Sequence, residues 1–99
     1  MIARLTFHSD AAHGWLEVPS AMLNELGIAD KVSAFSYQSE GKTVAFLEED
    51  CDATLFYNVA QAHGYTIEER RVYDGDESHV RRLPSYGSDV TPGFEKVTA

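Results

Sequence analysis

The chain is short of cysteine and of long apolar segments, and each shortage excludes a class of protein. A single cysteine, Cys51, leaves no partner for an internal disulfide, which favours a reducing compartment. No apolar run approaches the roughly 20 residues that a membrane-spanning helix requires. The opening segment MIARLTFHSD lacks the basic and apolar blocks of a secretory signal. These absences predict a soluble protein of the cytoplasm.

Basic residues are also scarce, because eight Lys and Arg stand against 16 Asp and Glu, for a formal net charge of −8. Proteins that bind nucleic acid directly need Lys and Arg to displace counterions from the phosphates. The charge therefore disfavours direct binding to nucleic acid. The composition is otherwise globular, since 43% of the 99 residues are hydrophobic and 11% are aromatic. A chain of this length is expected to form one domain with its own core.

Hydrophobic periodicity predicts five strands. Alternation with a period of two, bounded by turn residues, marks strands at 2–8, 14–18, 32–38, 44–48 and 66–73. The first two strands are expected to pair as an antiparallel hairpin. The third and fourth are joined by a turn in which Gly41 suits a positive φ. The last contains four charged residues, which predicts a place at the edge of the sheet.

Two short helices are predicted between these strands. Pro19 suits the first turn of a helix that ends at Gly27, because the missing N–H of a proline costs nothing there. Asp50 or Asp52 is expected to cap a second helix, which ends at Gly64. Apolar residues at helical spacing in this second helix are expected to face the core: Leu55, Phe56, Val59 and Ala60.

The order β-β-α-β-β-α-β predicts a single α+β domain, in which two short helices cover a mainly antiparallel sheet of about five strands. Residues 1–83 are expected to form this domain. Residues 84–99 are poor in apolar side chains and contain two prolines and two glycines. Because little apolar burial offsets the entropy of ordering such a segment, we expect a loosely ordered tail.

Four carboxylates surround the cysteine in the segment FLEEDCDATLFYN, residues 46–58: Glu48, Glu49, Asp50 and Asp52. One helix cap needs one side chain, so a cap leaves three carboxylates unexplained. Exposed carboxylates on a rigid fold can take the places of phosphates and steer a basic partner to the surface. The alternative is a solubilising surface around a helix cap.

A small thiol-dependent or metal-dependent enzyme is the second hypothesis, with Cys51 acting beside His8, His13 or His63. The neighbouring carboxylates oppose thiolate formation at Cys51, and a buried structural cysteine is expected instead. His8 and His13 are five residues apart, not the four of a helical zinc pair, and are expected to be partly exposed loop residues. The acidic segment lacks the central glycine and distant glutamate of a calcium loop. No catalytic residue, metal site or cofactor is therefore predicted.

A third hypothesis is a regulatory protein that binds nucleic acid through two arginine pairs, Arg70-Arg71 and Arg81-Arg82. Each pair could contact phosphates. The net charge opposes this interpretation.

Three stretches occur together and in order: HGWLEVP (13–19), LGIADKVSAFSYQ (26–38) and LEEDCDA (47–53). They resemble a family of small proteins from bacteriophages, plasmids and integrated mobile elements. The resemblance covers roughly residues 5–75, and it implies no catalytic residue. It implies a setting in which small acidic proteins antagonise host defence, including restriction and CRISPR systems, some of them by mimicking DNA.

The sequence thus predicts a non-enzymatic acidic protein that inhibits a host nucleic-acid-binding defence complex, of anti-CRISPR or anti-restriction type, by presenting a DNA-like carboxylate surface. Its partner would be a basic surface of a host protein or nucleoprotein complex, with no direct contact to nucleic acid or membrane. A monomer or small homo-oligomer is expected. The residues expected to contact the partner are Glu48, Glu49, Asp50, Asp52, Glu40 and Glu17.

Overall fold

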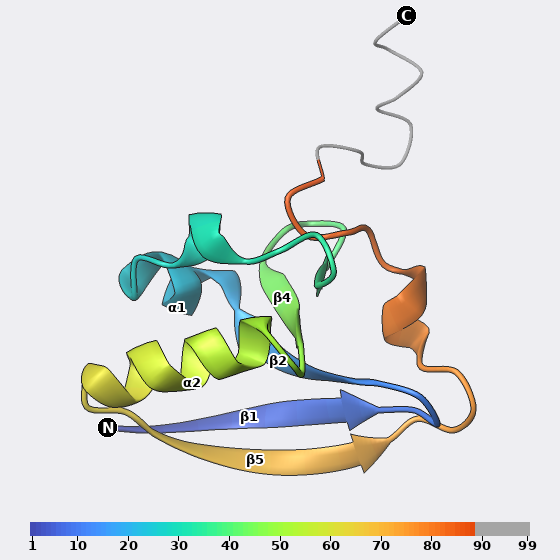
Figure 1. Cartoon of the computed structure of the whole chain (residues 1–99), viewed down its shortest axis with the longest axis horizontal. Helices are drawn as coiled ribbons and strands as arrows, with labels where there is room; N and C mark the ends of the chain where they lie inside the picture. Colours follow the sequence, from blue (N-terminus) through green and yellow to red (C-terminus); the bar gives the residue numbers. More distant parts are fainter. Residues whose placement is uncertain (89–99) are drawn as a thin grey trace, which may run out of the picture.

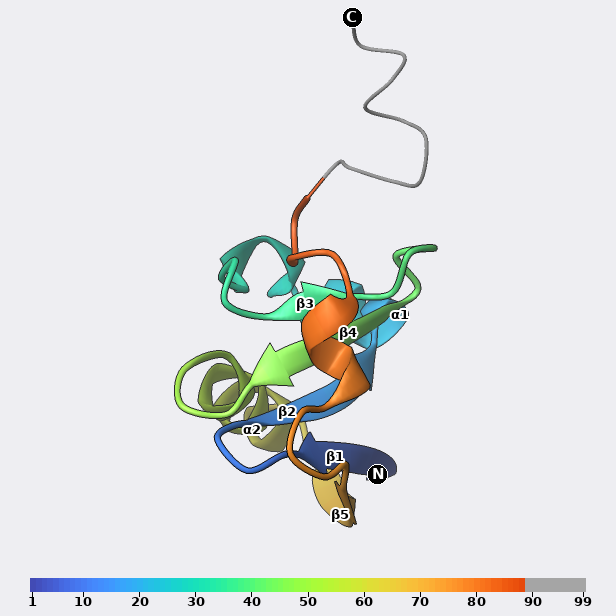
Figure 2. The same ribbon diagram turned by 90° about the vertical axis from the view of Figure 1, so that its right-hand side faces the viewer.

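The computed structural model describes residues 1–88 of the chain. The elements are β1 (Ile2–Ser9), β2 (Gly14–Pro19), α1 (Ser20–Glu25), the 3-10 helix η1 (Ala29–Lys31), β3 (Tyr37–Gln38), β4 (Val44–Glu48), α2 (Asp52–Ala62), β5 (Thr66–Tyr73) and the 3-10 helix η2 (His79–Arg82). The strands form one sheet in the order β3-β4-β2-β1-β5 (Figures 1 and 2). The predicted α+β class and the order of its strands and α-helices are confirmed.

The sheet is mostly antiparallel, with one parallel pair. Antiparallel pairing joins β1 with β2, β2 with β4 and β3 with β4. The parallel pair, β1 with β5, matches Ile2 with Thr66 at one end and Ser9 with Tyr73 at the other (Figure 1). Because β5 also runs parallel to β4, the chain needs a crossover between them, and α2 supplies it. The predicted edge position of β5 is confirmed.

The main core lies between the sheet and its two α-helices. Leu16 and Val18 of β2 and Leu47 of β4 are fully buried against Phe56 of α2. The four residues predicted to face the core do so to different extents. Two are fully buried and two are partly buried against the same cluster: Phe56 and Ala60, then Leu55 and Val59.

The opposite face of the sheet is covered in part by η2. Trp15 of β2 and Phe46 of β4 project to this face and are 2% and 7% exposed. Val80 of η2 packs onto them, with Tyr37 and Leu83 alongside. Figure 2 shows η2 (orange) in front of β4. The sheet therefore has a second, smaller apolar cluster on the face away from the α-helices.

Both α-helices end at a glycine in the left-handed conformation, as predicted. At the end of α1, the Ile28 N–H donates to the Leu23 carbonyl (3.0 Å) and the Gly27 N–H donates to the Asn24 carbonyl (3.1 Å). Gly27 has a φ of 74° and Gly64, which follows α2 with the same pair of bonds, has a φ of 89°. A residue with a Cβ would be strained at either position.

The strand predicted at 32–38 is shorter than expected, because β3 spans only Tyr37–Gln38. The residues before it form η1 and a loop, and the Asp52 side chain at the start of α2 holds this loop through Ser33 and Ser36. In the turn after β3, the left-handed residue is Lys42, with a φ of 60°, and not Gly41. Alternating apolar residues predict a strand here, but tertiary hydrogen bonds override that preference.

Residues 84–88, which the sequence assigns to the tail, lie against β3 and η1. The Gln38 N–H donates to the Pro84 carbonyl (2.9 Å) and the Tyr86 N–H donates to the Ser36 carbonyl (2.8 Å). The Tyr86 hydroxyl donates to the Ala29 carbonyl (2.5 Å). Packed structure thus continues past the boundary expected at residue 83, and the rest of the predicted tail, 89–99, lies outside the described residues. Within residues 1–88, no helix has the length and apolar character to cross a membrane.

Truncation of Phe56 should be costly to stability. Because its side chain is fully buried between α2 and the sheet, Phe56→Ala is expected to lower the free energy of unfolding by about 3–5 kcal/mol. Leu55→Ala, at a partly buried position of the same helix, should cost less. Denaturant unfolding followed by circular dichroism measures both values. Equal losses of unfolding free energy for the two variants would contradict the difference in burial between Phe56 and Leu55.

Candidate functional site

The acidic segment between β4 and α2 divides into two carboxylates with structural roles and two that form no side-chain hydrogen bond or ion pair with other residues of 1–88. The Glu48 carboxylate accepts hydrogen bonds from the backbone N–H groups of Asp50 (3.0 Å) and Cys51 (3.1 Å), which closes the turn. Asp52 is only 4% exposed. Glu49 and Asp50 are exposed. Local structure therefore accounts for half of the crowded negative charge.

Asp52 holds the loop that precedes β3. Its Oδ2 atom accepts hydrogen bonds from the Ser33 N–H (3.0 Å), the Ser33 hydroxyl (2.7 Å) and the Ser36 hydroxyl (2.5 Å). The Ser36 Oγ atom in turn accepts a bond from the Glu48 N–H (2.8 Å). The predicted cap by Asp50 or Asp52 is wrong. The N-cap residue is Cys51, which makes no side-chain cap bond, and the Asp52 side chain binds the loop instead.

Cys51 is exposed, so the prediction of a buried structural cysteine is wrong. The buried positions at the start of α2 belong to Asp52 and Ala53, whose neighbours in the core leave Cys51 on the outside. His63 lies at the other end of α2, about 16 Å along an 11-residue helix. Its ring Nδ1 lies 2.9 Å from the Val59 carbonyl. The thiol and this histidine therefore do not form a site.

A cavity of about 380 Å³ lies beside the acidic segment and is lined by His13, Trp15, Phe35, Tyr37, Glu48, Asp50, Cys51 and Arg81. The rings of Trp15 and Tyr37 meet edge to face, with centroids 6.1 Å apart. Phe35 is 80% exposed. The cavity thus combines three aromatic side chains with two carboxylates.

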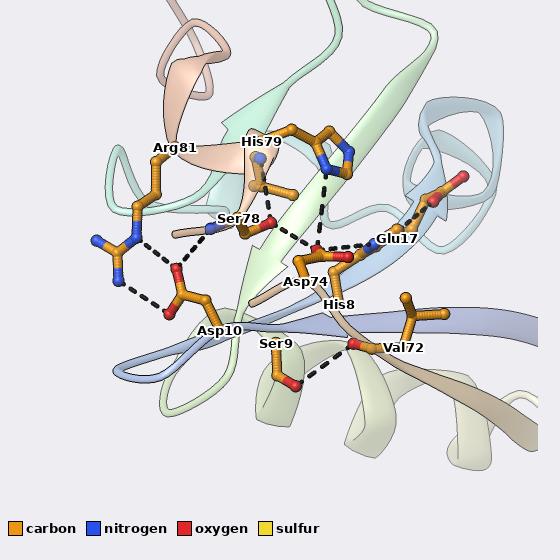
Figure 3. Close-up of polar contacts among 10 residues, drawn as sticks. His8, Ser9, Asp10, Glu17, Val72, Asp74, Ser78, His79 and Arg81 are labelled. Atoms are coloured by element: carbon orange, nitrogen blue, oxygen red, sulfur yellow. Dashed lines mark hydrogen bonds and ion pairs between the residues drawn. The ribbon is translucent and has the colours of Figure 1, made fainter. Parts of the chain in front are cut away.

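The positive charge of Arg81 is neutralised within the protein (Figure 3). Its Nε atom donates to Asp10 Oδ2 (2.6 Å) and its Nη2 atom donates to Asp10 Oδ1 (3.1 Å). Its guanidinium group also lies over the Trp15 ring, 5.2 Å from the centroid. The bond from Arg81, with further bonds from the backbone of Ser78 and His13, holds the pKa of the Asp10 carboxyl far below its usual range. Glu48 and Asp50 therefore leave the cavity negatively charged.

A second group of polar side chains lies at the carboxyl ends of β1 and β5. His8 Nε2 donates to Glu17 Oε1 (2.7 Å), and His8 Nδ1 lies 3.4 Å from Asp74 Oδ2. His79 Nδ1 lies 3.9 Å from the same Asp74 oxygen. Figure 3 shows these side chains pointing toward one another. The prediction of a loop position for His8 is wrong, because β1 extends to Ser9, and its side chain is 12% exposed.

Ser78 links the two polar groups. Its N–H donates to Asp10 Oδ2 (2.9 Å) and its hydroxyl donates to Asp74 Oδ2 (2.6 Å). No motif or spacing in the sequence marks Ser78, Asp10 or Asp74 as a functional residue. The local pattern around Asp74 indicates only a turn. Asp10 lies 68 positions from Ser78, so no local pattern predicts that contact, whereas Asp74 is four positions away.

The other predicted contact residues lie apart from the acidic segment. The Glu17 carboxylate is bonded to His8, as described above. Glu40 is exposed in the turn after β3, at the opposite end of β4 from Glu48, about 15 Å along the strand. The structure brings Glu48, Glu49 and Asp50 together and leaves the remaining predicted residues in separate places.

The arginine pairs of the third hypothesis are engaged separately. On β5, Arg71 bonds Glu69 (3.0 Å) and lies over the Phe7 ring, 4.5 Å from its centroid. Arg81 is held by Asp10, on the other face of the sheet. These contacts do not assemble the pairs into one basic surface.

The two polar groups differ in the chemistry they suit. Aromatic walls with nearby carboxylates suit a cationic group, through cation–π attraction and charge-assisted hydrogen bonds. The group around His8 presents nitrogen and carboxylate atoms of the kind that bind transition metals. Comparison of the chain with protein-family models, curated proteins and solved structures finds no match.

Removing the Asp52 carboxylate should destabilise the fold. Asp52→Ala leaves three donors of Ser33 and Ser36 without their acceptor, and the expected loss is about 2–4 kcal/mol of unfolding free energy. Asp50→Ala, at an exposed neighbouring carboxylate, is the matched control and should change stability by less than about 0.5 kcal/mol. Urea denaturation measures both. Similar values would show that Asp52 does not hold the loop.

Asp10 should make stability sensitive to acid. Because its pKa is lowered in the folded state, the unfolded state binds a proton first as the pH falls through the ordinary value of about 3.9. Its contribution is therefore complete above about pH 5 and is lost progressively in more acidic solution. Asp10→Asn should lower the melting temperature at neutral pH and flatten its decline below about pH 5. Melting curves across this range that coincide for both proteins would contradict this role.

Proposed function

We propose that the protein is a non-enzymatic binding protein that docks onto a basic surface of a partner protein. The observation that supports this most directly is the cavity beside the acidic segment, in which Trp15, Phe35 and Tyr37 surround space next to Glu48 and Asp50. A volume of about 380 Å³ is large enough for the end of a lysine or arginine side chain. The partner would insert such a side chain into the cavity.

Arg81 illustrates the chemistry that the cavity accepts. Its guanidinium group lies over Trp15 while it bonds a carboxylate. A cation over an aromatic ring gains about 0.5–2 kcal/mol, and more when water is excluded. An incoming arginine or lysine would find the same two elements, with Tyr37 and Phe35 as the rings and Asp50 and Glu48 as the carboxylates.

Exposed residues around the cavity would enlarge this contact. Phe35 is 80% exposed, and aromatic side chains of this kind are common anchors at protein interfaces. Asp50 lines the cavity and is exposed, and Glu49, the residue before it in the chain, is also exposed; exposed carboxylates speed the approach of a basic partner. We therefore assign the contact to Phe35, Glu49 and Asp50 around the cavity, since Asp52 is buried and Glu17 is bonded to His8.

The partner that we propose is the basic nucleic-acid-binding surface of a host defence complex, and inhibition would follow from occupying that surface. Such a surface displays Lys and Arg placed to meet phosphates. The net charge of −8 and the resemblance to small proteins of mobile elements support this choice. The carboxylates of the acidic segment would then stand in for phosphates of DNA.

The double variant Glu49→Gln, Asp50→Asn tests the proposal. The untagged wild type, immobilised and exposed to bacterial lysate, should retain a partner that this variant does not retain. The control variant Asp30→Asn, Glu40→Gln makes the same change in net charge at exposed positions elsewhere and should retain it. With the purified partner, the test variant should associate about tenfold more slowly at low salt, and the difference should shrink at high salt.

Two further measurements separate docking from general charge effects. Phe35→Ala should mainly raise the dissociation rate, because it removes apolar contact and no charge. The wild type should also displace nucleic acid from the purified partner. If the association rates of the test and control variants coincide at every salt concentration, the acidic segment serves only as a solubilising surface.

A further inference from the structure

We propose that His8, Asp74 and His79 form a binding site for a divalent transition-metal ion, with Zn²⁺ as the best fit. One ligand atom from each residue lies within 4.8 Å of the other two. The three side chains come from β1, the segment after β5 and η2, and Figure 3 shows them directed at a common point. The site lies apart from the cavity proposed to bind a partner, and it rests on different observations.

The spacing of the ligand atoms suits a tetrahedral ion. With bonds of about 2.0–2.1 Å, two ligands of tetrahedral zinc lie about 3.4 Å apart. His8 Nδ1 and Asp74 Oδ2 are 3.4 Å apart. His79 Nδ1 lies 3.9 Å from the same oxygen, about 0.5 Å beyond a tetrahedral edge. Because the His79 side chain is 57% exposed, its ring is free to close this difference.

The protonation of His8 directs an unpaired nitrogen at the site. Its Nε2 atom lies 2.7 Å from Glu17 Oε1, and a carboxylate only accepts, so Nε2 carries the proton. In a neutral imidazole the Nδ1 atom is then unprotonated and carries a lone pair. Among residues 1–88 this buried atom has no hydrogen-bond partner, and it faces the Asp74 carboxylate. Nδ1 and the Asp74 oxygen both carry lone pairs and lie 3.4 Å apart, so a cation between them would be bound favourably.

Neighbouring groups hold the ligands in the orientation that a metal requires. The Glu17–His8 bond has the arrangement in which a carboxylate orients a metal-bound histidine and makes it more basic. The Ser78 hydroxyl donates to Asp74 Oδ2 (2.6 Å) and fixes the carboxylate. The His8 ring also packs beside the Phe46 ring, with centroids 5.8 Å apart. His8 and Asp74 are therefore positioned before any ion arrives.

The ligand set determines which ions fit. Two imidazoles and one carboxylate suit Zn²⁺, Co²⁺, Ni²⁺ or Cu²⁺, whereas Ca²⁺ and Mg²⁺ prefer oxygen ligands alone. Three protein ligands leave the fourth tetrahedral position for water. An ion here would tie η2 to β1, because His79 belongs to η2 and His8 to β1. It would thus stabilise the segment that also places Arg81 at the cavity.

The experiment is calorimetric titration of Zn²⁺ into the untagged, chelator-treated protein near neutral pH. One ion should bind per chain, and the melting temperature should rise with Zn²⁺ concentration. His79→Ala should lower the affinity by about 100-fold or more, since loss of an outer-shell partner alone costs about 10–100-fold. His13→Ala and His63→Ala remove exposed histidines outside the group and should bind Zn²⁺ like the wild type.

His79→Ala is the chosen variant because an exposed side chain can be removed without loss of the fold, which circular dichroism verifies. Glu17→Ala should weaken binding by about 10–100-fold while leaving the three ligands in place. Long-range proton–nitrogen spectra of the histidine rings should show the His8 Nδ1 signal shift when Zn²⁺ is added. Absence of binding, equal binding by folded His79→Ala, or a His8 ring protonated on both nitrogens and unaffected by Zn²⁺ would each overturn the proposal.

Discussion

The parallel pairing of β5 with β1 is the constraint on which the two polar groups depend. Because Ser9 lies opposite Tyr73, the two strands end together. The residues that follow them, Asp10 and Asp74, therefore leave the sheet at the same end. An antiparallel β5 would place Asp74 at the far end of an eight-residue strand, about 26 Å away. The crossover through α2 makes the parallel direction possible, so the helix that completes the main core also decides where these carboxylates lie.

The segment after β5 begins at this end of the strands and covers part of the second face of the sheet. Val80 contributes apolar packing onto Trp15 and Phe46, while Asp10 fixes the orientation of η2 through its bonds to Arg81 and the Ser78 N–H. The net contribution of a buried ion pair of this kind to stability is reduced, because the loss of hydration offsets much of the attraction. Its geometry favours one arrangement of the segment over others. Apolar contact and the bonds of Asp10 both stabilise this segment, and the polar bonds also select one placement. That placement brings one wall of the cavity and His79 into position together.

The acidic segment shows how one short stretch can serve several physical ends. Asp52 holds the loop before β3, and Glu48 closes the turn between β4 and α2. Glu49 and Asp50 remain exposed, and their proximity to each other does not stabilise the fold. Their cost in mutual repulsion would be offset by a basic partner. The proposed function thus depends on two carboxylates and the adjacent aromatic cavity, a narrower surface than the six separate acids that the sequence suggests.

The sequence alone determined the features that arise from neighbours along the chain. Alternating apolar residues mark β1, β2 and β4, four charges place β5 at an edge, and glycines end both α-helices, because each depends on local periodicity or on a single φ angle. Only the tertiary structure decided which side chains meet. Asp10 and Arg81 are 71 positions apart, Asp52 binds serines that precede it by 16 and 19 positions, and His8 meets Asp74 through strand pairing. Such contacts follow from the direction and register of strands, which the hydrophobic pattern of a single strand does not encode.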